Sequence, residues 1–146
     1  MQRDPGGVLA YSPLAQGLLT GKFKGPDEVD DERARVRWFS KNRAGTVHDS
    51  EGCEQEAFKA VEKIRAISAD IGEPMANVAL AWVLQQPGVT AVLAGARKPG
   101  QIIENARAVD LELTDEVLKT LSDATQEVKE NIGPNADPWR TESRIR

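Results

Sequence analysis

Cysteine is almost absent from this chain, which has 146 residues and a single cysteine, Cys53. A lone cysteine excludes a disulfide-stapled secreted fold, and it excludes zinc-ribbon and iron–sulfur sites, which need several thiolates. Long apolar runs are missing too. No stretch approaches the roughly 20 residues of a transmembrane helix, and the first residues lack the apolar segment of a signal peptide. These absences predict a cytoplasmic protein without a membrane segment.

A large net charge is also lacking, because 19 Lys and Arg stand against 23 Asp and Glu and give a net charge of −4. An acidic balance offers no general attraction to nucleic acid, so no nucleic-acid partner is expected. The remaining composition, with 40% hydrophobic residues and 12 glycines, is typical of one globular domain that is long enough to bury a core.

The first half of the chain predicts a strand, a long loop and a helix. The run at residues 8–12 is typical of a strand that ends before Pro13, because proline cannot donate to a sheet ladder. Residues 13–52 mix glycine, proline and both charge signs without periodicity, which predicts a long surface loop. Apolar residues recur at helical spacing over 54–71, and Gly72 is placed to end that helix in a left-handed conformation.

The second half predicts a buried helix, a buried strand and two further helices. A helix over 74–86 contains the segment VALAWVL, which is apolar nearly all round and should be buried on several sides. The uninterrupted run at 89–94 predicts a parallel strand buried on both faces. Pro99 fits the first position of a helix over 99–108, and Thr114 fits the N-cap of a helix over 114–132. Residues 133–146 are predicted to form a polar tail.

Strands that alternate with helices indicate an α/β fold with parallel strands. The end of each strand carries residues that suit ligand binding. After the first strand, Ser12 to Gly17 combine a rigid turn, a hydroxyl and a glycine that lets backbone approach a ligand. After the second strand, Arg97 and Lys98 precede a helix N-terminus, where free N–H groups and the guanidinium favour a phosphate.

Further along that second helix, Gln101, Glu104 and Asn105 stand at spacing i, i+3 and i+4 and therefore share one face. Amide and carboxylate groups in this arrangement can read a base or a ribose. By themselves, however, the two patterns also fit an ordinary strand-to-helix connection with solvated cations and an exposed polar helix face.

The segments YSPLAQGLLTGK (11–22) and GVTAVLAGARKPGQIIENARAVDLELTDE (88–116) resemble the C-terminal part of aldo-keto reductases. The similar branch is the one that includes potassium-channel β subunits and bacterial stress-related reductases, and the closing NADPWRTESRIR is similar to tails of some members. The resemblance implies the seventh and eighth βα units plus terminal helix of a TIM (β/α)8 barrel, incomplete in this chain.

The same resemblance implies NADP(H) as cofactor. It assigns stacking on the nicotinamide to Tyr11. It assigns contacts to the pyrophosphate to the loop after Tyr11 and to one lysine: Ser12, Pro13, Leu14, Ala15, Gln16 and Lys22. It assigns the 2′-phosphate, ribose and adenine to residues at the second strand end, with Lys98 as an additional phosphate partner: Gly95, Arg97, Gln101, Glu104 and Asn105. NADP is favoured over NAD because a 2′-phosphate needs cationic partners. Four loop arginines are either clamps for the pyrophosphate or solvated side chains: Arg33, Arg35, Arg37 and Arg43.

Catalytic residues cannot be assigned. The family reduces carbonyls by hydride transfer from the nicotinamide, with a tyrosine general acid helped by lysine, aspartate and usually histidine on earlier strands, which this chain does not contain. Tyr11 is the only tyrosine and matches the stacking position. His48 lies in the long loop and is expected to be solvated. Cys53 has no recognisable partner and is expected to be a plain residue at a helix start.

A complete (β/α)8 barrel takes ~250 residues, and two parallel strands cannot close a barrel or cover their own edges. We therefore expect either a fragment of a longer reductase or a quarter barrel that must associate with itself or with the missing N-terminal part. The leading hypothesis is the cofactor-binding portion of an NADP(H)-dependent reductase of small carbonyls, inactive alone. The alternative is a non-catalytic NADP-binding or assembly module. Trp139 and Arg140 either line the edge of a substrate pocket or belong to a tail that packs elsewhere.

Overall fold

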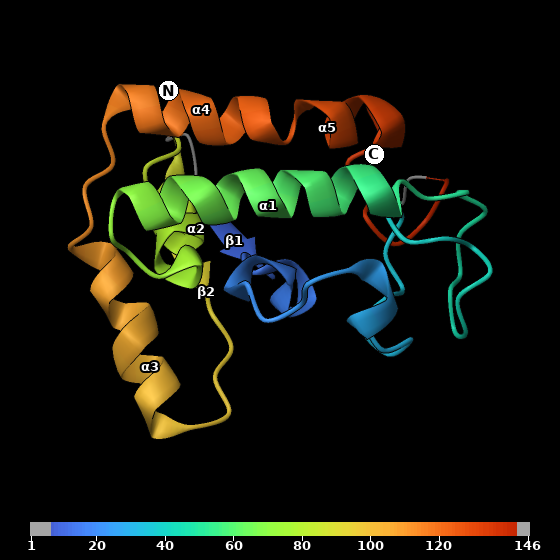
Figure 1. The fold of residues 1–146 in the computed structure, drawn as a ribbon, viewed down its shortest axis with the longest axis horizontal. Coiled ribbons are helices and arrows are strands. Elements are labelled where there is room, and N and C mark those ends of the chain that lie inside the picture. Colours follow the sequence, from blue (N-terminus) through green and yellow to red (C-terminus); the bar gives the residue numbers. More distant parts are fainter. Residues whose placement is uncertain (1–6, 143–146) are drawn as a thin grey trace, which may run out of the picture. The chain divides into compact units, whose positions relative to one another are not determined.

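The computed structural model describes residues 7–142. Its strands, α-helices and short 3-10 helices (η) follow one another along the chain as β1 (Val8–Tyr11), η1 (Ala15–Thr20), η2 (Pro26–Glu28), α1 (Glu54–Asp70), α2 (Met75–Leu84), β2 (Val89–Leu93), α3 (Pro99–Ala106), η3 (Arg107–Val109), α4 (Asp115–Ala124) and α5 (Gln126–Ile132) (Figure 1). The chain divides into two compact units. Unit 1 contains the chain up to Lys22 and Arg65–Lys119, and unit 2 contains Phe23–Ile64 and the chain from Thr120.

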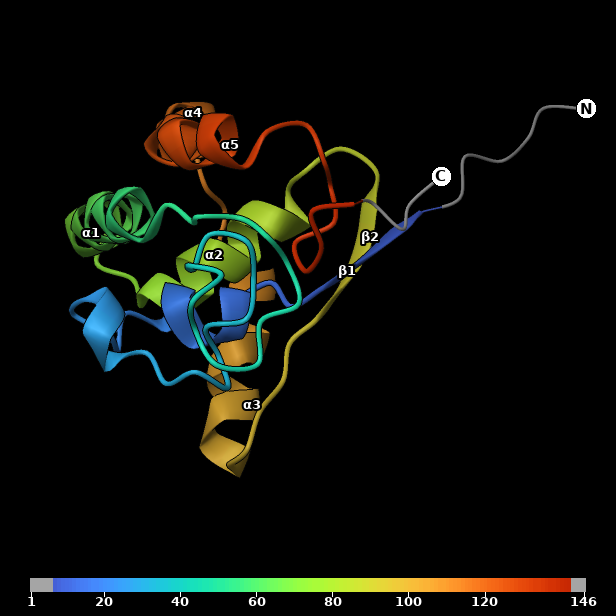
Figure 2. The same cartoon turned by 90° about the vertical axis from the view of Figure 1, so that its right-hand side faces the viewer.

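In unit 1, β1 and β2 pair in parallel, as predicted, and Figure 2 shows them side by side. Tyr11 pairs with Leu93 at the end of the ladder, so both strands leave the sheet at the same edge. The prediction that the second strand is buried on both faces is wrong, since Leu93 is 54% exposed and Leu9 on β1 is 58% exposed. Larger parallel sheets are covered by helices on both faces, and the described residues provide only a two-stranded sheet.

Helix α2 forms the core of unit 1 and packs against β2. Its all-round apolar character predicted burial, and Val78 and Ala81 have no exposed surface. Polar side chains at its C-terminal end tie the helix to later parts of unit 1. Trp82 Nε1 donates to the carbonyl oxygen of Leu118 at 3.2 Å, and Gln85 Nε2 donates to that of Leu111 at 2.9 Å. These contacts join α2 to the segment that leads into α4 and to α4 itself.

Most predicted helix ends agree with the structure. Gly72, two residues beyond the end of α1, has a φ of +74°, Pro99 is the first residue of α3, and Thr114 Oγ1 accepts a hydrogen bond from the Val117 N–H at 3.3 Å. The single helix predicted over 114–132 is wrong, because the structure has two helices, α4 and α5, with a break at Thr125. The Thr125 hydroxyl donates to the Ser122 carbonyl at 3.0 Å and competes with the backbone pattern of a continuous helix.

In unit 2, the predicted surface loop is in large part core. Val36 and Phe39 are each 1% exposed and Val29 is 3% exposed, although no regular spacing of apolar residues in the sequence predicts their burial. They share this burial with Val61 on α1, which is 2% exposed. Residues 23–53 therefore form a packed segment whose order comes from side-chain contacts, because it contains one short 3-10 helix and no strand.

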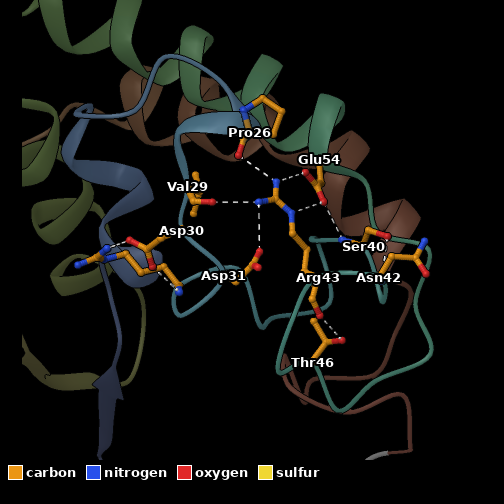
Figure 3. A network of polar contacts seen from close by, with 10 residues as sticks. Pro26, Val29, Asp30, Asp31, Ser40, Asn42, Arg43, Thr46 and Glu54 are labelled. Carbon is orange, nitrogen blue, oxygen red and sulfur yellow. Dashed lines mark hydrogen bonds and ion pairs between the residues drawn. The ribbon is translucent and has the colours of Figure 1, made fainter.

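The side chain of Arg43 organises this segment (Figure 3). Its guanidinium donates to the carbonyl oxygens of Val29 and Pro26, each at 2.9 Å, and its Nη2 lies 2.6 Å from Glu54 Oε2. Glu54, the first residue of α1, also accepts a hydrogen bond from the Ser40 N–H at 2.8 Å. One cation and one carboxylate thus satisfy backbone groups that a sheet or helix would otherwise pair.

The first part of the predicted polar tail is packed, because Arg37 contacts it. This arginine is 7% exposed. Its Nη2 donates to the Ile132 carbonyl at 2.5 Å and its Nη1 to the Asn135 carbonyl at 3.1 Å. Its backbone N–H donates to the Pro138 carbonyl at 2.8 Å. Asp137, between these contacts, is 1% exposed and belongs to the core of unit 2.

We predict that Gly52→Ala destabilises the chain far more than Gly72→Ala. Both glycines have positive φ, +81° and +74°, but an added Cβ at Gly52 would lie 2.6 Å from the backbone carbonyl carbon of Phe39, whereas Gly72 has no atom within 4 Å. Gly72→Ala should cost about 1–2 kcal/mol for the left-handed conformation alone, and Gly52→Ala several kcal/mol in addition for backbone displacement. Urea unfolding of both variants measures this, and equal losses would contradict it.

We also predict that Glu54 contributes stability that depends on pH. Burial acts to raise the pKa of this carboxyl, but the hydrogen bonds from Arg43 and Ser40 outweigh it and hold the pKa below its ordinary value. A carboxyl with a lower pKa in the folded state stabilises the protein above its unfolded pKa, and this stabilisation is lost as the pH falls through the folded value. The gap in unfolding free energy between the parent chain and Glu54→Gln should therefore narrow as the pH falls from 7 to below about 4. A gap that stays constant over this range in urea titrations would disprove the role of Glu54.

Candidate functional site

The turn after β1 is strained in a way that points to function. Ser12, Ala15 and Gln16 have φ values of +52°, +48° and +60°, in the left-handed region that residues with a Cβ avoid. Each such residue costs of order 1–3 kcal/mol and persists only where the surrounding structure holds it, often at ligand sites. Here the Ala15 N–H donates to the Ser12 carbonyl at 3.0 Å and closes the turn. The rigid turn predicted from Ser12-Pro13 is therefore present.

Two further predicted residues flank this turn. Tyr11, the last residue of β1, is 60% exposed. Lys22 lies close to the turn, because a Cβ added at Gly17 would be 3.0 Å from Lys22 Nζ. The lack of a side chain at Gly17 therefore leaves room for the ammonium group beside the strained backbone.

The connection after β2 presents two cations at the start of α3. Arg97 and Lys98 are exposed, and neither forms an ion pair within residues 7–142. The side chain of Gln101 bends back over this end of the helix, where its Oε1 accepts hydrogen bonds from the backbone N–H of Arg97 at 2.8 Å and of Lys98 at 3.2 Å. Glu104, one turn later, pairs with Arg107 at 2.8 Å. The connection predicted to bind phosphate therefore carries a neutral side-chain cap.

A cavity of about 530 Å³ in unit 1 brings the two strand ends together. Its lining includes six residues predicted from the sequence, one from the first strand end and five from the second: Leu14, Gly95, Lys98, Gln101, Glu104 and Asn105. Gly95 leaves part of the wall open, since a Cβ added there would meet no atom within 4 Å. The remaining predicted residues lie outside this lining, on the same two strand ends: Tyr11, Ser12, Pro13, Ala15, Gln16, Lys22 and Arg97.

The other wall of the cavity was not predicted from the sequence. It comes mainly from the start of α2, with one further residue each from η1 and α3: Pro74, Ala76 and Asn77, and Thr20 and Gly100. Asn77 is 2% exposed, and its Oδ1 has no hydrogen-bond partner among the described residues. The sequence does show Asn77 as a polar residue inside an otherwise apolar helix. Its place in the cavity wall could be inferred only by knowing that α2 and α3 pack against each other.

The four loop arginines lie in unit 2, and contacts there account for three of them. Arg33 pairs with Asp30, Arg43 with Glu54, and Arg37 with the chain around Asn135. A solvated role is wrong for Arg37, which is buried. Arg35 is exposed.

His48 and Cys53 are both buried, so the expectation of a solvated histidine is wrong. His48 is 5% exposed, its Nδ1 accepts a hydrogen bond from the Ser50 N–H at 3.3 Å, and burial lowers its pKa. Burial raises the pKa of the Cys53 thiol to about 11, which keeps the thiol protonated and poorly nucleophilic at neutral pH. Neither side chain is placed as a nucleophile or base.

Among residues 7–142, the His, Cys, Asp and Glu side chains include no group of three that could hold a metal ion. None of the helices in this range has the length and apolar character required to cross a bilayer.

Comparison with known proteins relates this geometry to one family. The sequence model described as the Aldo/keto reductase family matches residues 4–126. A Schizosaccharomyces pombe protein with the provisional name of voltage-gated potassium channel subunit beta is 36% identical over 119 residues, which are 80% of this chain and 33% of that protein. An uncharacterized oxidoreductase of Bacillus subtilis is 36% identical over 122 residues, 83% of this chain and 33% of its own.

Among solved structures, a glycerol dehydrogenase from Gluconobacter oxydans matches with a TM-score of 0.63 and 29% identity, over 90% of this chain and 37% of that chain. This chain thus spans about a third of the length of the curated relatives that it matches. Their shared fold assigns β1, β2 and the helices after them to the seventh and eighth βα units of a TIM (β/α)8 barrel, which is incomplete in this chain. The match over most of the sequence shows that the chain belongs to the aldo/keto reductase family.

Proposed function

We propose that this chain is the NADP(H)-binding portion of an aldo-keto reductase and that it reduces no carbonyl by itself. The cavity that joins the two strand ends is the observation that carries this proposal. Ligands of such barrels bind at the carboxyl ends of the strands, and the parallel register brings both ends to one edge of the sheet.

The residues present fit the cofactor at its adenosine end. Arg97 and Lys98 would hold the 2′-phosphate, since they offer two cations without ion pairs in the described chain beside the N-terminus of α3. Glu104 and Asn105 would take the ribose and the adenine. The openings at Gly95 and Gly100, where an added Cβ would meet nothing within 4 Å, leave room for the ligand to approach the backbone. This donor set favours NADP(H) over NAD(H).

At the other end of the cofactor, the strained turn from Ser12 to Gln16 and Lys22 would hold the pyrophosphate, and the exposed ring of Tyr11 would stack on the nicotinamide. Aldo/keto reductases generally use NAD(P)H, which supplies the hydride when it is bound. The tyrosine that would donate a proton is lacking, because Tyr11 is the only tyrosine of the chain. A small carbonyl substrate therefore requires further parts of the barrel.

A second candidate function is a non-catalytic NADP-binding or assembly module. The exposed apolar surface of the sheet favours it, because Leu9 and Leu93 are more than half exposed and a packed protein rarely leaves a parallel sheet uncovered. Self-association or the N-terminal part of a barrel would cover this surface. We place either form of the protein in the cytoplasm.

We predict that Arg97→Ala weakens binding of NADP+ about tenfold or more, because it removes a charge-assisted contact to phosphate. The affinity for NAD+, which lacks the 2′-phosphate, should change little, so the ratio of the two affinities falls. Quenching of the fluorescence of Trp38, Trp82 and Trp139 on titration would measure both. Lys63→Ala is the charge-matched control, since Lys63 is an exposed residue of α1 outside the cavity lining. Equal effects of the two substitutions would refute a specific role for Arg97.

We further predict that the 146-residue chain does not oxidise NADPH in the presence of a reactive aldehyde. The reason is chemical, since the single tyrosine, Tyr11, is assigned to stacking on the nicotinamide and no second tyrosine is available as the general acid. The assay follows absorbance of NADPH on material whose intact mass has been verified, together with NADPH binding on the same sample. Turnover above a protein-free control would show that the chain is catalytically complete.

A further inference from the structure

Asn77 stands out on α2, because it is the one Asn, Gln or charged side chain between Met75 and Leu84. Its backbone N–H donates to the Pro74 carbonyl at 2.9 Å, so the unpaired group of this residue lies in its side-chain amide. The residue is 2% exposed, and Oδ1 has no hydrogen-bond partner among the described residues. A buried acceptor without a donor destabilises the fold, and an apolar side chain of similar size would avoid this penalty.

The position of Asn77 suggests what the missing donor is. The side chain lines the same cavity as Lys98, Glu104 and Asn105. No hydrogen bond within the described chain fixes Oδ1, so rotation about the Cβ–Cγ bond can turn this oxygen toward a ligand. A phosphate cannot serve as the partner, because its oxygens are acceptors as well. A ligand group that pairs with Oδ1 must therefore carry an N–H or O–H donor.

The other residues that line the cavity indicate which donor group of the ligand lies beside Asn77. Phosphate would be held at the start of α3 by Arg97 and Lys98, whereas Pro74, Ala76 and Leu14 give the cavity apolar surface that suits the flat face of a base. Asparagine is well matched to adenine, because its amide oxygen can accept from the 6-amino group. We propose that Asn77 is a specificity-determining residue, and that its Oδ1 accepts a hydrogen bond from the 6-amino group of adenine. This inference rests on the proposed NADP(H) function.

The experiment compares NADP+ with its hypoxanthine analogue, in which a 6-oxo group replaces the 6-amino group and the ribose and phosphates are unchanged. The parent chain should bind NADP+ about tenfold more tightly, which corresponds to one hydrogen bond with a buried partner. Asn77→Leu should lower the affinity for NADP+ to that for the analogue and bring the ratio to about one. Asn77→Asp keeps an acceptor of the same shape and should retain a preference for the amino group.

Two controls separate recognition from folding. The urea midpoint of Asn77→Leu should not fall below that of the parent chain, because leucine removes an unpaired buried acceptor. Asn131→Leu, a matched substitution at an exposed position of α5, should leave both affinities unchanged. If Asn77→Leu does not fold, Asn77→Ala takes its place as the variant without an amide oxygen, and a preference for NADP+ that stays at the parent value would overturn the role of Asn77.

Equal binding of the two dinucleotides by the parent chain would overturn the role of Asn77 and leave the proposed NADP(H) function intact. The same holds if Asn77→Leu retains the preference for NADP+, or if it weakens both ligands equally, which would indicate a contact to a ribose hydroxyl instead. Absence of binding by either dinucleotide would overturn the proposed function and this inference with it.

Discussion

The parallel pairing of β1 with β2 determines where every part of the site lies. Tyr11 and Leu93 are partners at the end of the ladder, so the strained turn after one strand and the cationic connection after the other leave the sheet at the same edge. An antiparallel arrangement of the same residues would send Ser12 and Arg97 to opposite edges. The apolar helix α2 packs on β2 and places Asn77 in the wall of the cavity that results.

The elements that could be predicted from the sequence are those whose order comes from local rules. Helix α1 has regular spacing and a glycine at its end, α3 begins at a proline, and Thr114 supplies a side-chain cap. The packing of residues 23–53 could not be predicted, because it has no period. It depends on the guanidinium of Arg43 and on that of Arg37, whose acceptor at Asn135 is 98 positions away in the sequence. Whether an arginine in a charged stretch is solvated or buried depends on such distant carbonyls.

The candidate site also contains residues that local sequence rules predict and residues that they do not. Residues at the strand ends could be predicted, because a turn with Ser12-Pro13 and a connection with Arg97 and Lys98 carry their chemistry in consecutive residues. Asn77 could not, since its importance comes from a missing partner, and that can be recognised only when the surroundings of Oδ1 are known. His48 in unit 2 shows that a chemically prominent residue can also mislead. As an isolated loop histidine it was expected to be solvated, but it is 5% exposed.

At the start of α3, a neutral side chain satisfies backbone donors that the proposed phosphate contact would use. Four N–H groups at the start of a helix lack partners within the helix, and here Gln101 Oε1 satisfies the N–H groups of Arg97 and Lys98 from one turn ahead. The cap is neutral, so it leaves the positive potential of the helix end and of the two side chains in place. A phosphate brings up to two negative charges and forms stronger, charge-assisted hydrogen bonds with the same donors, so it can displace the amide oxygen. Gln101 would then be free to turn toward the proposed ligand along the face that it shares with Glu104 and Asn105.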